Sequence, residues 1–356
     1  MNYINPNLVF KEVPIGKTGW SSPSNIALVK YWGKKENQIP ANPSLSFTLN
    51  KSQTETFVEF SPSENNVGNI EFFLEGIPKP EFAKKISEFF ISITSIFPFL
   101  LQLNFKIYSK NTFPHSAGIA SSASGMSAIA LCLCDIENQY FNSFATKEEF
   151  YKKASFVARL GSGSACRSIY GGIVTWGEAD LGSDLYGTKL SAKIDPVFVT
   201  FNDSILIVDS DQKKVSSSVG HGLMNTNPFS ESRFKQANSN FTSLVNVLKT
   251  GDLEEFVKIV ESEALTLHSM MMTSNPYFLL MKPNTISIIE KIWEFRNETG
   301  IQACFTLDAG PNIHLLYPNE NKEDVHEFIV SELLSYTVNN KVIHDKVGNG
   351  PVKLDL

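Results

Sequence analysis

The segment from Pro114 to Gly125 most constrains how this chain can fold. It reads Pro-His-Ser-Ala-Gly-Ile-Ala-Ser-Ser-Ala-Ser-Gly, and the helix-like run Met-Ser-Ala-Ile-Ala-Leu-Cys-Leu-Cys follows directly. Small residues let a backbone approach a polyphosphate closely, and the helix N-terminus adds partial positive charge. The alternative is an ordinary loop in which Ser121 or Ser122 caps the helix. The spacing is neither a P-loop nor Gly-x-Gly-x-x-Gly, so the rest of the chain must decide.

Length and charge limit the protein classes to be considered. With 356 residues the chain exceeds what one hydrophobic core usually serves, so we expect two domains. The net charge of −6, without any Lys/Arg cluster longer than a pair, argues against a nucleic-acid partner. A substrate with several negative charges would therefore need local donors and a metal ion.

The cysteines and the hydropathy of the chain predict a cytoplasmic protein without a membrane segment. The cysteines lie scattered, mostly in apolar context, as reduced thiols do: Cys132, Cys134, Cys166 and Cys304. No Cys-x-x-Cys or His cluster indicates zinc. The N-terminus does not resemble a signal peptide, and the apolar stretch 89–105 is interrupted by polar residues and Pro98.

Hydrophobic periodicity predicts an α+β protein. A glycine-rich passage at 177–187 is a plausible domain boundary, which divides the chain into 1–190 and 191–356. We expect strands at Ile26–Val29, Thr54–Phe60, 103–109, 169–176, Val197–Phe201, Ser204–Asp209, Ala303–Leu307 and Asn312–Leu316. We expect helices at 80–96, 122–140, 146–160, 228–249, 252–272 and 284–299.

Two further segments carry cations and hydroxyls in suggestive positions. Lys30 ends an apolar strand, and Lys34 lies in the turn beyond it; each is either a surface lysine or a cation held in a cleft. The second segment, Gly161-Ser-Gly-Ser-Ala-Cys-Arg-Ser168, can present hydroxyls, N–H groups and a guanidinium to one anion. An exposed arginine at a helix start is the alternative for Arg167.

The last segment is Thr306-Leu-Asp-Ala-Gly-Pro-Asn312. Asp308 either stabilises a turn through its own backbone or directs a carboxylate into a cleft.

Together, in this order, these segments resemble the GHMP kinase superfamily, and within it the diphosphomevalonate decarboxylases. The resemblance runs from about residue 20 to about residue 317. It implies a two-lobed GHMP kinase fold, with a first lobe like domain 2 of ribosomal protein S5, a ferredoxin-like second lobe and the active site between them. It also implies a homodimer.

The implied reaction is ATP-dependent. ATP phosphorylates the 3-hydroxyl of mevalonate 5-diphosphate, and phosphate and carbon dioxide then leave to give isopentenyl diphosphate. By resemblance, Asp308 is the catalytic aspartate that takes or orients the hydroxyl proton. Lys30 keeps that aspartate ionised and offsets phosphoryl charge. Arg167 clamps the substrate carboxylate.

The resemblance also assigns ligand contacts. The substrate contacts are Tyr31, Trp32, Gly33, Lys34, Ser162, Gly163, Ser164, Ala165, Cys166, Arg167 and Ser217. The ATP contacts are Ala117, Gly118, Ala120, Ser121, Ser122 and Ser124. Mg²⁺ is implied because phosphoryl transfer between two polyanions needs a hard cation, although no protein ligand for it is assigned.

The chain departs from the family pattern at several positions. His221 stands where a methionine is usual, and an arginine that the family places near residue 80 to bind diphosphate has no clear counterpart, although Lys84 or Lys85 could substitute for it. About forty C-terminal residues lie outside the pattern. Two enzymes on the same scaffold remain alternatives: a decarboxylase of mevalonate 5-phosphate and a mevalonate 3-kinase. A non-catalytic binding protein is disfavoured because both Asp308 and the loop are present.

Overall fold

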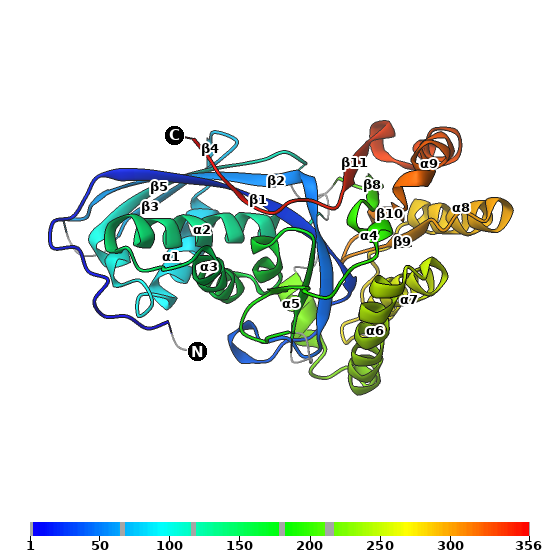
Figure 1. The fold of residues 1–356 in the computed structure, drawn as a ribbon, viewed down its shortest axis with the longest axis horizontal. Coiled ribbons are helices and arrows are strands. Elements are labelled where there is room, and N and C mark those ends of the chain that lie inside the picture. The colour runs from blue at the N-terminus through cyan, green and yellow to red at the C-terminus, as the bar shows by residue number, and fades with distance from the viewer. Residues whose placement is uncertain (1–2, 65–67, 115–118, 178–181, 211–216, 356) are drawn as a thin grey trace.

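The computed structural model describes residues 3–355 apart from 65–67, 115–118, 178–181 and 211–216, and in it the chain forms two lobes, each built on one sheet (Figure 1). The strands are β1 (Gly16–Val29), β2 (Ser44–Pro62), β3 (Ile70–Leu74), β4 (Ile77–Pro78), β5 (Leu103–Asn111), β6 (Ile173–Trp176), β7 (Thr188–Lys189), β8 (Asn202–Leu206), β9 (Cys304–Thr306), β10 (Ile313–Tyr317), β11 (Val342–Lys346) and β12 (Val352–Lys353). The helices are α1 (Pro80–Ser92), α2 (Ser121–Phe141), α3 (Lys147–Gly161), α4 (Pro196–Val199), α5 (Ser217–Leu223), α6 (Ser230–Thr250), α7 (Leu253–Met272), α8 (Pro283–Thr299) and α9 (Lys322–Phe328).

The N-terminal lobe is built on the long hairpin of β1 and β2. Its sheet runs β12-β1-β2-β5-β3-β4, with β6 paired to β2 and β7 to β6. Burial alternates along β2 from Ser52 to Phe60, which confirms the half-buried strand predicted there. In Figure 1 helices α1, α2 and α3 lie together on one side of this sheet, and α2 packs on β1 and β2.

The C-terminal lobe has the ferredoxin-like strand order. Its sheet runs β11-β8-β10-β9, and each neighbouring pair is antiparallel. Numbered by chain order within the lobe, this is 4-1-3-2, with helices between β8 and β9 and between β10 and β11. Figure 1 places α6, α7 and α8 beside this sheet, away from the N-terminal lobe's helices α1 to α3.

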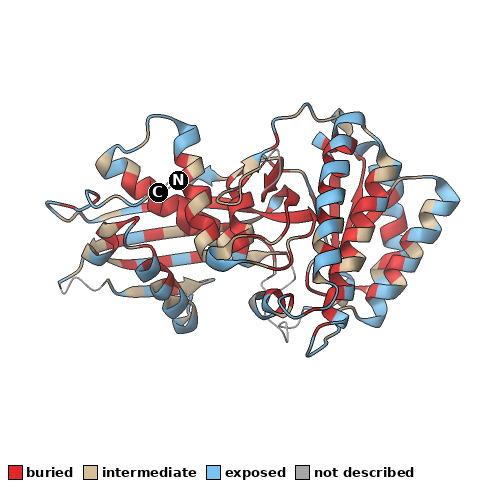
Figure 2. Cartoon of the chain, turned by 90° about the horizontal axis from the view of Figure 1, so that it is seen from below, coloured by how far each residue is buried: buried red, intermediate tan, exposed pale blue. Residues whose placement is uncertain are grey.

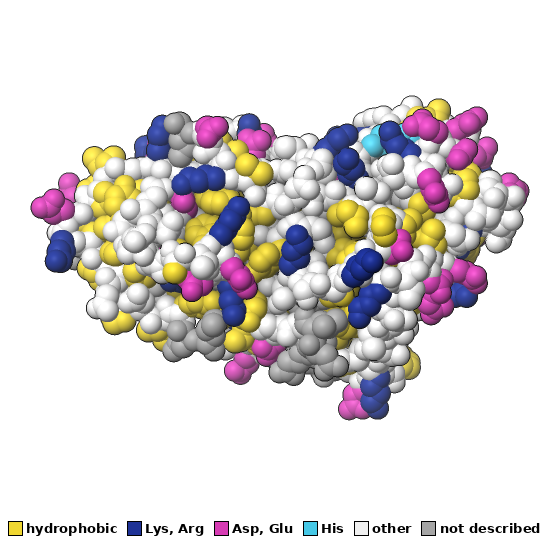
Figure 3. Space-filling view, in the orientation of Figure 1, with side chains coloured by type: hydrophobic (Ala, Val, Ile, Leu, Met, Phe, Trp, Pro, Cys, Tyr) yellow, Lys and Arg dark blue, Asp and Glu magenta, His cyan; other side chains and the backbone are white. Residues whose placement is uncertain are grey.

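Both lobes have apolar cores, and red buried segments run through the helices and strands of each in Figure 2. Lys and Arg side chains are scattered over the face drawn in Figure 3 without forming a broad basic patch. Within the described residues, none of the helices combines the length and the apolar character needed to cross a membrane. The four cysteines, all of them described, are buried and free.

One predicted strand is wrong. Residues 197–201 were expected to be extended because they are rich in valine and phenylalanine, but Pro196–Val199 forms the short helix α4. The Asp195 side chain accepts a hydrogen bond from the backbone N–H of Val197 at 3.0 Å, and Pro196 occupies the first turn. A capping aspartate followed by proline starts a helix, and these local signals outweigh the β propensity of the run.

The C-terminal segment ties the two lobes together. After β11 in the second sheet, the chain returns to the first sheet, where β12 pairs with β1. Buried Asp345 of β11 accepts hydrogen bonds from the backbone N–H groups of Asn50, Lys51 and Ser52 of β2, at 2.8, 2.9 and 2.7 Å, and from that of Lys346 at 2.8 Å. A single carboxylate of the C-terminal lobe thus satisfies three consecutive donors of the N-terminal lobe.

We predict that Asp345→Ala lowers the free energy of unfolding by about 3 kcal/mol, because buried N–H groups lose a charged acceptor. Asp345→Asn keeps one acceptor oxygen and should cost less. Urea unfolding followed by circular dichroism measures both, with Asp324→Ala, an exposed aspartate of α9, as the matched control. An Asp345→Ala variant as stable as the control would show that these hydrogen bonds to Asp345 do not contribute to stability.

Candidate active site

A pocket of about 1050 Å³ brings the predicted segments together. Its lining includes the following predicted residues: Lys30, Tyr31, Trp32, Lys34, Ala120, Ser121, Ser122, Ser162, Gly163, Ser164, Arg167 and Asp308. Gly33, Ser124, Ala165 and Cys166 do not line it. Ala117 and Gly118 lie outside the described residues, as does the side chain of Ser217.

An ion pair between the two lobes forms part of the pocket lining. Lys30 follows β1, and its Nζ lies 2.9 Å from Oδ1 of Asp308, which follows β9. The Lys30 side chain is 1% exposed and that of Asp308 is 28% exposed, so the aspartate is the partner that a ligand can still reach. Burial lowers the pKa of the Lys30 ammonium, and the Asp308 carboxylate opposes this shift.

The loop that carries Asp308 is held from three sides. His268 of α7 makes a hydrogen bond through Nε2 with the Asp308 carbonyl at 3.2 Å. The Asn312 side chain accepts the N–H groups of Val208 and Asp209 at 2.7 and 2.9 Å. The hydroxyl of Thr285 donates to the Pro311 carbonyl at 2.8 Å. Asp308 is therefore placed by a fixed loop.

A second ion pair holds the main chain of Lys30. Arg233 of α6 and Glu263 of α7 form a bidentate pair with N–O distances of 2.7 and 2.5 Å, and neither side chain is exposed. Glu263 accepts the backbone N–H of Lys30 at 2.8 Å. The backbone carbonyl of Lys30 accepts hydrogen bonds from Arg233 at 3.2 Å and from Asn42 at 3.0 Å. Sequence reasoning missed Arg233 and Glu263, because in the sequence they are ordinary charges within helices.

Arg167 is buried and held rigidly. Its Nε and Nη2 both donate to Oδ1 of Asn25, at 3.3 and 3.2 Å, and its Nη1 donates to the hydroxyl of Ser44. A guanidinium has five N–H donors, so among the described residues one N–H remains on each terminal nitrogen. This pair can bind a carboxylate in bidentate fashion. The structure does not support the alternative of an exposed arginine, since Arg167 is only 3% exposed.

The segment before Arg167 contributes its first residues to the pocket lining. Ser162, Gly163 and Ser164 line the pocket, whereas Cys166 points into the core, where burial raises the pKa of its thiol to about 12. Gly163 is required by a close approach, since a Cβ there would lie 2.9 Å from the hydroxyl oxygen of Tyr31. That hydroxyl is buried and has no hydrogen-bond partner among the described residues.

The turn after Lys30 carries aromatic and cationic groups. Tyr31, Trp32 and Lys34 line the pocket, and Lys34 donates to the side chain of Gln38 at 3.2 Å. Gly33 has a φ of 97°, and its N–H donates to Nδ1 of His221 at 3.0 Å. The Gly33 N–H is thus engaged within the protein.

The small-residue loop leads into α2 with its hydroxyls available. Ala120, in the left-handed conformation, occupies the N-cap position of α2 without a side-chain cap, so neither Ser121 nor Ser122 acts as the cap. Their hydroxyls make no hydrogen bond to other described residues. Ser124 is buried instead, and its hydroxyl pairs with that of Thr54 at 2.6 Å. Within the described part of this loop, Ser121 and Ser122 are therefore the serines whose hydroxyls a ligand can contact.

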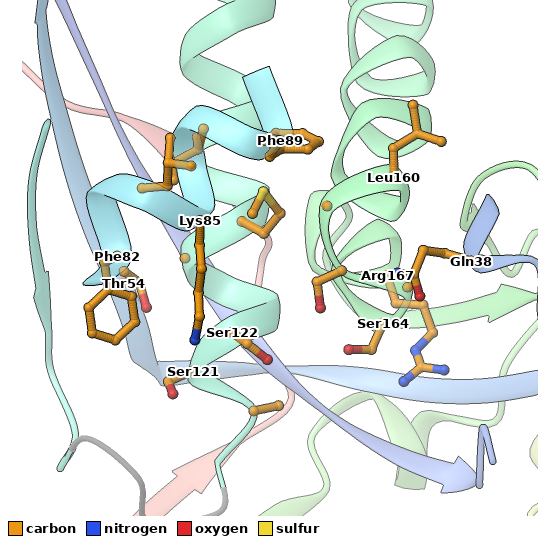
Figure 4. Close-up of a pocket in the computed structure, with 18 of the residues that line it drawn as sticks. Gln38, Thr54, Phe82, Lys85, Phe89, Ser121, Ser122, Leu160, Ser164 and Arg167 are labelled. Atoms are coloured by element: carbon orange, nitrogen blue, oxygen red, sulfur yellow. The ribbon is translucent and has the colours of Figure 1, made fainter. Parts of the chain in front are cut away.

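Helix α1 forms the opposite wall of this part of the pocket. Figure 4 shows Lys85 extending from α1 with its ammonium toward Ser121 and Ser122. Phe82 and Phe89, also of α1, line the pocket as well, and Figure 4 shows Lys85 between them. Lys84 does not line it. Of the two lysines considered as replacements for the family's arginine, Lys85 alone faces the pocket.

The donors around the pocket fit a magnesium–nucleotide complex. Mg²⁺ is commonly bound by one or two carboxylates together with substrate phosphates, rather than by a full set of protein ligands. Asp308 supplies a partly exposed carboxylate, and Ser121 and Ser122 supply hydroxyls. In the described part of the chain, His, Cys, Asp and Glu form no group of three or more that is suited to hold a metal ion.

Comparison with known proteins identifies the family. Residues 22–187 match the family model described as the diphosphomevalonate decarboxylase-like N-terminal domain, and residues 204–353 match the mevalonate 5-diphosphate decarboxylase C-terminal domain. A relative from Debaryomyces hansenii named diphosphomevalonate decarboxylase is 29% identical over 322 residues, covering 86% of this chain and 80% of the relative. One of the same name from Saccharomyces cerevisiae is 29% identical over 328 residues, covering 87% and 80%.

Solved structures point to the same family. Mevalonate diphosphate decarboxylase from Staphylococcus aureus has a TM-score of 0.82 at 28% identity, covering 96% of this chain and 99% of that one. A structure of the protein called MDDEF, in complex with MVAPP, AMPPCP and magnesium, has a TM-score of 0.82 at 27% identity, covering 96% and 100%. Since both halves match in order and the motifs surround one pocket, the chain belongs to the diphosphomevalonate decarboxylase family of the GHMP kinase superfamily.

Proposed function

We propose that Asp308, Lys30 and Arg167 carry the reaction of this chain, the ATP-dependent decarboxylation of mevalonate 5-diphosphate to isopentenyl diphosphate. The observation that carries the proposal is the Lys30–Asp308 ion pair, which presents a partly exposed carboxylate beside a buried cation in the pocket. ATP is the co-substrate and Mg²⁺ the accompanying ion.

ATP occupies the part of the pocket between α1 and the start of α2. Its phosphates lie between the ammonium of Lys85 and the hydroxyls of Ser121 and Ser122, so in this proposal Lys85 contacts ATP and does not replace the family's diphosphate-binding arginine. Bound Mg²⁺ neutralises phosphate charge as the phosphoryl group moves. Orphan N–H groups in the first turn of α2 add to the attraction for phosphate.

Mevalonate diphosphate occupies the other part of the pocket. Lys34, with the Tyr31 hydroxyl and Ser162 and Ser164, binds its diphosphate, and Arg167 holds its carboxylate by the two N–H donors that remain. This places the 3-hydroxyl near Asp308.

In the first step the 3-hydroxyl oxygen attacks the γ-phosphorus of ATP. Its proton passes to, or is oriented by, a carboxylate oxygen of Asp308, and the bond to the β-phosphate oxygen breaks to release ADP. A carboxylate is a weak base for an alcohol, so fixed positioning supplies most of the effect. The three anchors of the Asp308 loop provide that positioning.

In the second step the C3–O bond breaks and inorganic phosphate leaves. Positive charge develops at C3, and the electrons of the bond to the carboxylate carbon form the new double bond as carbon dioxide departs. Lys30 offsets the charge of the departing phosphate through its fixed ammonium.

We further propose that residues 1–190 and 191–356 act as the nucleotide-binding lobe and the lobe carrying the catalytic aspartate, although β12 returns to the first sheet. A homodimer in the cytoplasm is the form that the resemblance to the family supports. Four buried free thiols are compatible with a reducing compartment.

We predict that the purified protein with Mg-ATP and mevalonate 5-diphosphate releases ADP, phosphate and carbon dioxide in equal amounts. The products are followed separately, by a coupled ADP assay, a phosphate assay and trapped ¹⁴CO₂. ADP without carbon dioxide would instead identify a 3-kinase, and a clear preference for mevalonate 5-phosphate would identify the monophosphate enzyme.

We predict that Asp308→Asn lowers kcat by about 10²- to 10⁴-fold, because the substrate hydroxyl loses the carboxylate that accepts or orients its proton. Mevalonate diphosphate still binds, since its diphosphate contacts remain, and calorimetry measures this directly. Asp324→Asn, on the exposed face of α9, is the matched control. Substantial turnover by Asp308→Asn would refute the catalytic role assigned to this residue.

We predict that Lys85→Met raises KM for ATP about tenfold or more through loss of a charge-assisted contact, with little change in KM for mevalonate diphosphate. Lys84→Met, the neighbouring lysine that does not line the pocket, is the control and should match the wild type. A rise confined to KM for mevalonate diphosphate would instead assign Lys85 to the substrate's diphosphate.

A further inference from the structure

His221 of α5 is a pocket residue to which the proposed chemistry gives no role. Its ring lies between two aromatic rings of the turn after Lys30, with centroid distances of 4.2 Å to Tyr31 and 4.6 Å to Trp32. It is 8% exposed and lines the pocket. Its Nδ1 accepts the N–H of Gly33 at 3.0 Å.

This hydrogen bond fixes the protonation state of the His221 ring. A backbone N–H can only donate, so Nδ1 of His221 carries no proton, and the neutral ring carries its proton on Nε2. A protonated ring would place two donors against each other. Burial, followed by the charges of Lys34 and Arg167, lowers the pKa of His221 to about 3, which keeps the ring neutral over the range in which enzymes work.

The packing around the bond leaves little freedom. A Cβ on Gly220, the residue before His221, would lie 2.5 Å from ring atoms of Trp32, so α5 rests directly on that indole. On Gly33 a Cβ would lie 2.9 Å from the Phe234 ring of α6, and its φ of 97° disfavours any side chain. The turn is thus enclosed by α5 and α6, both from the second half of the chain.

Gly33 is buried, so its N–H would be costly without an acceptor. Within the described residues His221 is the acceptor that this N–H finds. If the bond were lost, the turn would have to move to reach water or another acceptor. Tyr31, two residues before Gly33, and Lys34, the residue after it, would move with the turn.

We propose that His221 is a positioning residue for the diphosphate of the substrate: by accepting the Gly33 N–H, it fixes the turn that presents Tyr31 and Lys34 to that diphosphate. The inference rests on the proposed role of Lys34 and Tyr31 in binding the diphosphate. His221 itself transfers no proton. It links a helix of the second half of the chain to a binding turn of the first half, so the substrate site has its final shape only when both are in contact.

Three substitutions separate the hydrogen bond from the packing. His221→Met replaces the ring by an apolar side chain of similar bulk, whose thioether sulfur is only a weak acceptor. His221→Asn provides an oxygen close to the position of Nδ1, which can accept the same N–H. His326→Met applies the first substitution to a histidine of α9 outside the pocket lining and serves as the control.

We expect His221→Met to raise KM for mevalonate diphosphate, and its Kd by calorimetry without ATP, about tenfold, the change that corresponds to about 1.4 kcal/mol. Its kcat and its KM for ATP should stay within about twofold of the wild type, since the reacting groups and the ATP part of the pocket are unchanged. His221→Asn should restore KM to within about threefold of the wild type. The pH profile of kcat/KM between pH 5 and 9 should be the same in wild type and His221→Asn, because the ring does not titrate there.

An unchanged KM in His221→Met, an equal defect in His221→Asn, or a loss confined to kcat would overturn the inference. So would a pH profile that loses one limb in His221→Asn, because the ring would then be acting as an acid or base. Lys34→Met separates this inference from the proposed function. If Lys34→Met raises KM for mevalonate diphosphate and His221→Met does not, the positioning role alone fails; if neither raises it, the proposed diphosphate site fails as well. Melting temperatures of all variants identify any that are misfolded.

Discussion

The cationic side chain of Lys30, at a position that is almost completely buried, is the constraint on which the rest of the site depends. An unpaired charge is very costly to bury, so Lys30 requires a carboxylate within contact distance. That carboxylate is Asp308 of the other lobe, at 2.9 Å. The lobes must therefore meet at this point for Lys30 to remain charged, and the contact that joins them is the ion pair that we propose to be catalytic.

The main chain of Lys30 depends on a second buried ion pair. Glu263 accepts its N–H, and Glu263 is itself a buried charge that Arg233 neutralises. Removing either partner of such a pair leaves the other as an unpaired buried charge, which is strongly destabilising. Among the described residues, five cations and three carboxylates line the pocket: Lys30, Lys34, Lys79, Lys85 and Arg167, and Glu81, Glu88 and Asp308. A chain with a net charge of −6 thus has local positive charge where an anionic substrate binds.

The sequence was most informative where function fixes residue types. Through the family resemblance, the order of its small-residue loop and of the segments around Lys30, Arg167 and Asp308 predicted the fold. These three residues line one pocket, whereas four other predicted contacts do not: Gly33, Ser124, Ala165 and Cys166. Local patterns also predicted most helices, but capping by Asp195 and Pro196 outweighed the β propensity of residues 197–201.

What the sequence could not predict depends on contacts between distant residues. Arg233 and Glu263 have no sequence signal, because their importance lies in which backbone atoms they meet after folding. The choice between Lys84 and Lys85 depended on the rotation of α1, which a short helix does not specify on its own. The pairing of β12 with β1 joins residues more than 300 positions apart, and no local pattern records it.

On the proposed roles, the rigidity of Arg167 bears on the order of the two chemical steps. A guanidinium that binds a carboxylate stabilises its negative charge, and this opposes the loss of carbon dioxide from the bound substrate. Asn25 and Ser44 hold the guanidinium in place, so it cannot follow the reacting group as the charge moves. The carboxylate therefore gives up its electrons only when the demand at C3 is strong, after phosphorylation has turned the hydroxyl into a leaving group. A fixed arginine thus favours phosphorylation before decarboxylation.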